Sequence, residues 1–115
     1  MAEVTPIRDT FLQSMQGKEA FLKRLFTVFL QHEPTRVAEL RSALEHDDLP
    51  KVRYLAHSLK GSAATMGADG LKDCCLALEK SAERGEHNLS LDRMGDLEAA
   101  IGEVYGFMSR FMDEH

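Results

Sequence analysis

The sequence has no tryptophan, only three prolines and only two cysteines. The adjacent Cys74 and Cys75 cannot form a disulfide framework, because disulfide-stabilised scaffolds use more cysteines and neighbours on a helix point in different directions. No apolar run is long enough to span a membrane, since segment 21–30 is interrupted by Lys23 and Arg24. Basic residues are also few: 14 Lys and Arg against 19 Asp and Glu give a net charge of -5. This balance argues against nucleic acid as a partner.

The length of the chain favours one small domain. With 115 residues, 43% of them hydrophobic, the chain is long enough for one core. Residues 1–6 lack a basic cluster followed by an apolar run, so no secretory signal is predicted. We therefore expect a single domain over 1–115, with its core at about 18–112, in a cytoplasmic monomer that does not bind membranes.

Apolar periodicity predicts five helices and no strands. Thr5 is expected to cap a short helix with Pro6 at its first position, ending near Gly17. A long helix is predicted from about 18 to 46, with a kink at Pro34. A third helix is predicted to be capped by Asp47 or Asp48, to have Pro50 in its first turn and to end near Gly67. A fourth is predicted over about 68–84, stopping at Gly85, and a fifth over about 90–113.

Connections of two to six residues force successive helices to lie antiparallel. The predicted fold is therefore all-α: an antiparallel up-down-up-down four-helix bundle with a short extra N-terminal helix.

The third predicted helix places a histidine where a packed core cannot use it. At about 100° per residue, one stripe of this helix is apolar and faces the core: Val52, Leu55, Leu59, Ala63 and Met66. His57 lies roughly opposite, and its neighbours on that face are Arg53, Lys60, Gly61 and Ala64, with Tyr54 at the edge. Most exposed histidines are ordinary surface residues. A glycine inside a helix, however, costs about 1 kcal/mol relative to alanine, and Gly61 would let another molecule reach the imidazole.

The string from His57 to Ala64, HSLKGSAA, resembles the signature of histidine-containing phosphotransfer (HPt) domains, roughly His-x-Leu-Lys-Gly-[Ser/Ala]-[Ser/Ala]. The Met66-Gly67-Ala68 segment that follows resembles the end of the same helix in this family. The resemblance covers about 18–112 and includes the segment 29–34, FLQHEP, and five positions of the next helix: Leu71, Cys75, Leu78, Glu79 and Ala82.

The resemblance implies a phosphorelay intermediate. His57 would accept a phosphoryl group from a receiver-domain aspartate and pass it to another receiver, Lys60 would be the cation beside the phosphate, and Gly61 would give the receiver clearance. The implied partners are response-regulator receiver domains and a hybrid sensor histidine kinase. The receiver would bring the Mg²⁺, so no cofactor is expected in this chain.

The chemistry of these side chains agrees with that role. A neutral imidazole is a good nucleophile, and its ordinary pKa of about 6.5 leaves much of it neutral at cytoplasmic pH. Lys60 can reach a phosphoryl oxygen, and Arg53 could do the same or steer an acidic partner. Tyr54, Ala64 and Leu76 are candidates for contact with a docked receiver.

Other functions lack the residues they need. There is no GxxxxGK[ST] phosphate loop and no glycine-rich nucleotide lid, so we expect a phosphate carrier and not an ATP-dependent enzyme. His32, His46, His87 and His115 have no zinc-site spacing with the cysteines. Two alternatives stay open. One is a phosphoacceptor module of a larger sensor or chemotaxis kinase, which the start at Met1 mildly disfavours. The other is a helical module that binds a receiver without carrying phosphate.

A stripe of small residues on the last predicted helix has no explanation in the family: Gly95, Ala99, Gly102 and Gly106. Two interpretations are open: the stripe is tolerated on an open helix face, or it allows another helix to approach closely. We favour an intramolecular contact with the N-terminal helix, because Phe11, Leu12 and Met15 need a surface to cover. A second copy of the chain is the other option.

Overall fold

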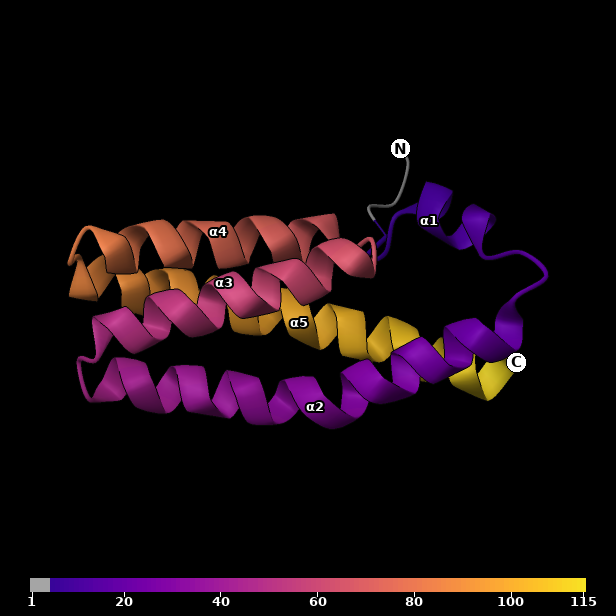
Figure 1. The fold of residues 1–115 in the computed structure, drawn as a ribbon, viewed down its shortest axis with the longest axis horizontal. Helices are drawn as coiled ribbons and strands as arrows, with labels where there is room; N and C mark the ends of the chain where they lie inside the picture. Colours follow the sequence, from indigo (N-terminus) through magenta and orange to yellow (C-terminus); the bar gives the residue numbers. More distant parts are fainter. Residues whose placement is uncertain (1–4) are drawn as a thin grey trace.

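The computed structural model describes residues 5–115; residues 1–4, part of the predicted single domain, lie outside the described range. Within that range the regular structure is entirely helical: α1 (Asp9–Ser14), α2 (Glu19–Glu45), α3 (Leu49–Thr65), α4 (Asp69–Glu83) and α5 (His87–Glu114). Helices α2 to α5 run alternately in opposite directions, and α5 packs beside α2 to close the bundle (Figure 1). The predicted all-α bundle with a short N-terminal helix is confirmed.

Local sequence signals set several helix boundaries. Asp48 caps α3 by accepting a hydrogen bond from the backbone N–H of Lys51 at 3.3 Å, with Pro50 in the first turn. After α3 and α4 the chain reverses at Gly67 and Gly85, whose φ angles of 69° and 72° favour glycine. Helix α2 continues through Pro34, and the kink expected there stays a prediction.

Helix α5 begins at His87, three residues before the predicted start at Ser90. Ser90 lies within the first turn of α5, and its hydroxyl faces α4. It donates to the Glu86 carbonyl and lies 2.8 Å from the Ser81 hydroxyl, buried between α4 and α5. The buried Ser90 hydroxyl therefore has hydrogen-bond partners inside the protein.

Packing in the core determines which face of α3 is buried. Val52, Leu55, Leu59 and Ala63 are all buried, as the periodicity predicts. Burying this stripe removes apolar surface from water and presents the opposite face of α3 to solvent. The core is completed by apolar side chains from the other helices, which include Phe26, Leu40, Leu71, Cys75, Leu97 and Met108.

The N-terminal segment differs from its prediction. Thr5 does not cap a helix; its hydroxyl donates to the Ile7 carbonyl at 2.7 Å, and α1 begins only at Asp9. Ile7 is completely buried, and the backbone of Arg8 after it is extended, with φ -61° and ψ 134°, so the helix starts only after these two residues. Arg8 then ties this segment to the α3–α4 turn: its backbone N–H donates to Gly67 O at 2.9 Å and its guanidinium pairs with Asp69 at 2.7 Å.

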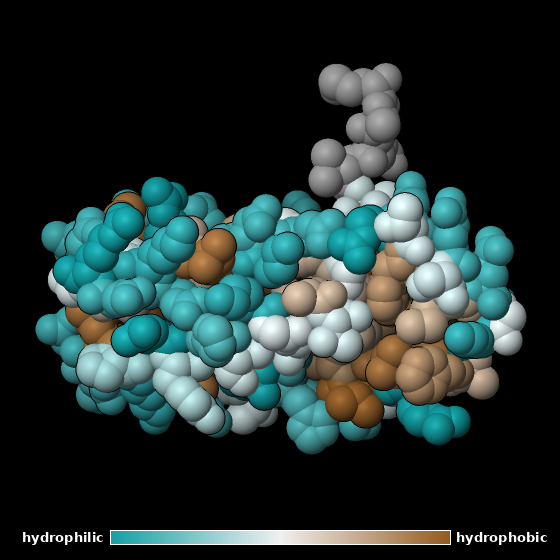
Figure 2. All heavy atoms as spheres, turned by 45° about the horizontal axis from the view of Figure 1, so that its top comes forward, coloured by the Kyte–Doolittle hydropathy of each residue, from teal (hydrophilic) through white to brown (hydrophobic). Residues whose placement is uncertain are grey.

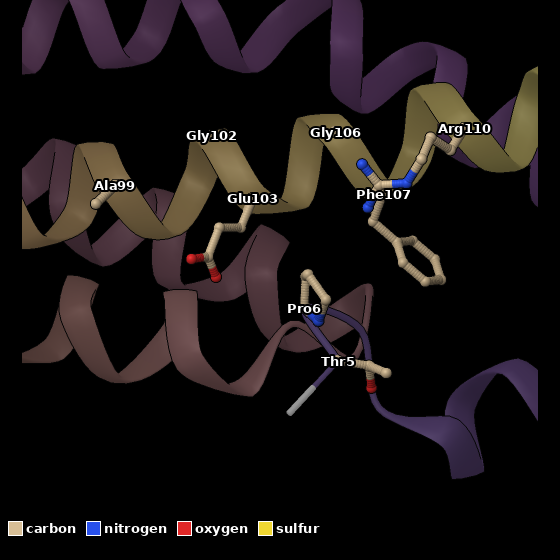
Figure 3. Close-up of a pocket in the computed structure, with 8 residues that line it drawn as sticks. All are labelled: Thr5, Pro6, Ala99, Gly102, Glu103, Gly106, Phe107 and Arg110. Atoms are coloured by element: carbon tan, nitrogen blue, oxygen red, sulfur yellow. The ribbon is translucent and has the colours of Figure 1, made fainter. Parts of the chain in front are cut away.

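The predicted contact between the N-terminal helix and the α5 glycine stripe is wrong. A Cβ built on Gly95 or Gly102 would meet nothing within 4 Å, and one on Gly106 would meet only the Arg110 guanidinium at 3.4 Å. Figure 3 shows Ala99, Gly102 and Gly106 along α5, with Thr5 and Pro6 across an open groove.

Helix α1 packs elsewhere: a Cβ on Gly67 would lie 2.7 Å from Phe11 Cβ. The close approach therefore occurs at the α3–α4 turn, where α1 covers the end of the bundle.

The face of the molecule seen in Figure 2 is mostly polar. Hydrophilic residues cover most of the face seen in Figure 2, and apolar side chains gather at its right-hand end, where Figure 1 places α1. Phe21 and Val28, both on α2, are about half exposed at 47% and 50%. No helix within residues 5–115 is both long and apolar enough to cross a membrane.

Candidate functional site

Helix α3 presents His57 to solvent in the middle of its length. The histidine side chain is 66% exposed, and Arg53, Tyr54, Gly61 and Ala64 are exposed beside it. A Cβ added at Gly61 would meet nothing within 4 Å, so this glycine is not required by packing. The structure thus brings together the residues that the sequence placed on one face.

Glu79 on α4 contacts both His57 and Lys60 of α3. Its Oε2 lies 2.8 Å from His57 Nδ1, and its Oε1 accepts a hydrogen bond from Lys60 Nζ at 2.8 Å. The Glu79 side chain is only 13% exposed, whereas Lys60 is 26% exposed. One largely buried carboxylate therefore holds both the imidazole and the ammonium group.

Sequence reasoning did not assign this role to Glu79. The family resemblance includes Glu79 but gives it no role. The available signal was a charged residue four positions after the buried Cys75, next to the apolar stripe of α4. The role itself depends on the register between α3 and α4, which the pattern of a single helix does not contain.

The electrostatics define which imidazole nitrogen is free. Burial raises the pKa of Glu79, but the hydrogen bonds and charges of Lys60 and His57 more than offset this, so its pKa lies below the ordinary value. Glu79 is therefore ionised at neutral pH, and an ionised carboxylate can only accept hydrogen bonds. Nδ1 must carry the proton that it shares with Glu79. The lone pair of a neutral His57 then lies on Nε2.

The other residues predicted to contact a receiver have side chains that make no hydrogen bond or ion pair with His57 or Glu79 within the described range. Arg53 lies 3.8 Å from Glu83, and both side chains are more than half exposed. Tyr54 is 73% exposed. Leu76, on α4 one turn before Glu79, is half-buried and so less available than expected for a point of contact.

The remaining reactive groups do not form a second centre. Burial raises the pKa of the Cys75 thiol to about 12, so this cysteine is an inert core residue. Burial also raises the pKa of the Cys74 thiol. Within residues 5–115 no group of three or more His, Cys, Asp and Glu side chains could hold a metal ion.

Comparisons with known proteins agree with this geometry. The model of the Hpt domain family matches residues 24–106. The crystal structure of histidine-containing phosphotransfer protein B (HptB) from Pseudomonas aeruginosa PAO1 superposes with a TM-score of 0.90 at 27% identity, covering 98% of this chain and 99% of that one. The histidine-containing phosphotransfer protein ZmHP2 from maize has the same fold, with a TM-score of 0.82 at 20% identity over 95% of this chain and 86% of that chain.

Curated relatives match over shorter regions. The virulence sensor protein BvgS of Bordetella bronchiseptica is 32% identical over 75 residues, which are 65% of this chain and 6% of BvgS. Multistep phosphorelay regulator 1 of Schizosaccharomyces pombe is 36% identical over 55 residues, 48% of this chain and 19% of that protein. The matched region is thus a small part of each of these two relatives.

Proposed function

Because the chain belongs to the Hpt domain family, we propose that it is a phosphorelay intermediate with His57 as its phosphoacceptor. It accepts a phosphoryl group from the phosphorylated aspartate of one receiver domain and passes it to another. The observation that carries this assignment is the exposed imidazole whose Nδ1 is held by a largely buried carboxylate, Glu79.

The hydrogen bond to Glu79 prepares the ring for attack. The Nε2 lone pair attacks phosphorus, the Nε2–P bond forms, and the bond between phosphorus and the aspartyl oxygen breaks. The electron pair of that bond returns to the aspartate, which leaves as a carboxylate. The imidazole becomes positively charged and keeps its Nδ1 proton, and the Glu79 carboxylate stabilises this charge as it develops.

The receiver supplies what this chain does not. We expect its Mg²⁺ and its catalytic groups to stabilise the transferring phosphoryl group. This chain supplies the oriented nucleophile, clearance at Gly61 and a surface that includes Arg53, Tyr54, Ala64 and Leu76. In this scheme the chain is a substrate and product of phosphotransfer and not an ATP-dependent kinase.

Lys60 has two possible functions. The sequence motif predicts a cation beside the phosphate, and in the structure its ammonium group is bonded to Glu79. It therefore keeps Glu79 ionised and oriented whether or not it also reaches the phosphoryl group.

A second candidate is the same chemistry inside a larger signalling protein. The similarity to part of BvgS, which is named as a virulence sensor protein, favours this candidate. The partners would then be receiver domains and kinase domains of that protein. The site and its mechanism would be unchanged.

The function is tested by incubating the chain with phosphorylated receiver domains and following the phosphate. Transfer should occur to the wild type and not to His57→Gln. His32→Gln, which changes an exposed histidine on the neighbouring helix, should accept phosphate normally. Transfer to His57→Gln at the wild-type rate would refute the assignment.

A further inference from the structure

A hollow lies beside His57 on the side nearer the start of α3. It has a volume of about 350 Å³ and is lined by Pro50, Arg53, Tyr54, His57 and Glu79. Neither Lys60 nor Gly61 lines it. Among the described residues that line the hollow beside the imidazole, Arg53 is therefore the one with a permanent positive charge.

The direction of helical side chains places the reactive nitrogen near this hollow. Side chains on an α-helix lean toward its N-terminus, so the ring of His57 lies over the preceding turn, which contains Arg53 and Tyr54. Glu79 holds the ring by Nδ1. Nε2, on the other edge of the ring, makes no hydrogen bond in the part of the chain that the structure describes.

The two neighbouring cations differ in their availability. Lys60 is 26% exposed and is held at 2.8 Å by Glu79, so reaching a phosphoryl group would cost it that bond. Arg53 is 55% exposed, and its pairing with Glu83 at 3.8 Å is weak because both groups are solvated. A guanidinium can also bind two phosphoryl oxygens at once, which an ammonium group does less well.

We infer that this hollow receives the phosphoryl group once it is bound to Nε2, and that Arg53, not Lys60, is the cation that binds it. This inference rests on the proposed function. Lys60 is then a positioning residue that acts through Glu79, and Arg53 stabilises the phosphorylated state directly.

The test uses the chain alone, phosphorylated by the small-molecule donor potassium phosphoramidate. The pH titration of the phosphoryl group is followed by ³¹P NMR in the wild type, Arg53→Gln and Lys60→Gln. The matched control is Lys51→Gln, which removes an exposed cation from the same helix outside the hollow. Circular dichroism melts check that each variant is folded.

A bound cation favours the dianion, so removing Arg53 should raise the pH midpoint of the titration. For a solvent-exposed ion pair the expected rise is roughly 0.2–0.7 pH units. Lys60→Gln should shift the midpoint less, and Lys51→Gln should leave it unchanged. An unshifted midpoint in Arg53→Gln, or a larger shift in Lys60→Gln, would overturn the inference. If the wild type takes no phosphate on His57, the proposed function fails and this inference fails with it.

Discussion

Replacing Glu79 tests the mechanism at the point where the structure adds most to the sequence. Glu79→Ala removes the acceptor of the His57 Nδ1 proton and the partner of Lys60, both at 2.8 Å. The ring then loses its fixed orientation and tautomer, and the charge that forms on phosphorylation loses its counter-ion. Phosphorylation of His57 should therefore slow.

The magnitude follows from the bond that faces the reacting ring. A hydrogen bond to a charged group contributes roughly 1.5–3 kcal/mol. The imidazole is 66% exposed, so solvent screening reduces this to about 1–2 kcal/mol. That range corresponds to roughly a 5- to 30-fold lower rate. Glu79→Gln keeps an acceptor but loses the charge, so its effect should be smaller.

The rate is measured with phosphoramidate as donor, and the tautomer of His57 by ¹⁵N NMR. Asp73→Asn, which neutralises an exposed carboxylate on the same helix, is the control and should behave like the wild type. Labelling of Glu79→Ala at the wild-type rate, with its imidazole still protonated on Nδ1, would show that Glu79 does not prepare the ring.

Three further predictions concern packing and charge. Gly61→Leu should fold normally, because a Cβ there meets nothing within 4 Å. It should slow phosphate transfer from a receiver much more than labelling by phosphoramidate. Equal effects on the two rates would show that Gly61 does not give the receiver clearance. Gly102→Ala should stabilise the chain by about 0.5–1 kcal/mol through helix propensity. Gly67→Ala should destabilise it, because the new methyl would clash with Phe11 and φ at this position is 69°. Thermal melts in which Gly102→Ala lowers Tm and Gly67→Ala raises it would contradict the packing described for these two glycines. Burial raises the pKa of Glu33, despite the charges of Arg36 and His32 and a hydrogen bond from Ser62, so the folded state loses stability as the pH rises above 4.5. Glu33→Gln should therefore raise Tm at pH 7 and not below pH 4.5. An equal gain in Tm at both pH values would exclude the titration of Glu33 as the cause.

Much of the fold could be predicted because it depends on local patterns. The buried positions of α3 recur at helical spacing, and Asp48, Pro50 and Gly67 mark its ends in the order that helix caps require. Those same signals place His57 on the exposed face. The family motif added the chemistry expected of that face.

The errors concern features that depend on three-dimensional packing. Thr5 looks like a helix cap, but its hydroxyl donates to the carbonyl of the buried Ile7, and α1 begins only at Asp9. The α5 glycines suggest a close contact, yet the contact occurs at Gly67, which the sequence marks only as the end of a helix. Glu79 could not be paired with His57 without the register of α3 against α4.

The central claim is that phosphate enters this chain at one nitrogen of one histidine. The direct measurement is to phosphorylate the chain with phosphoramidate and identify the modified atom by mass spectrometry and ¹H–³¹P NMR. We expect a single acid-labile phosphate on Nε2 of His57, with Nδ1 still protonated and bonded to Glu79. Phosphate on His32, His46, His87 or His115, or on Nδ1 of His57, would contradict this expectation.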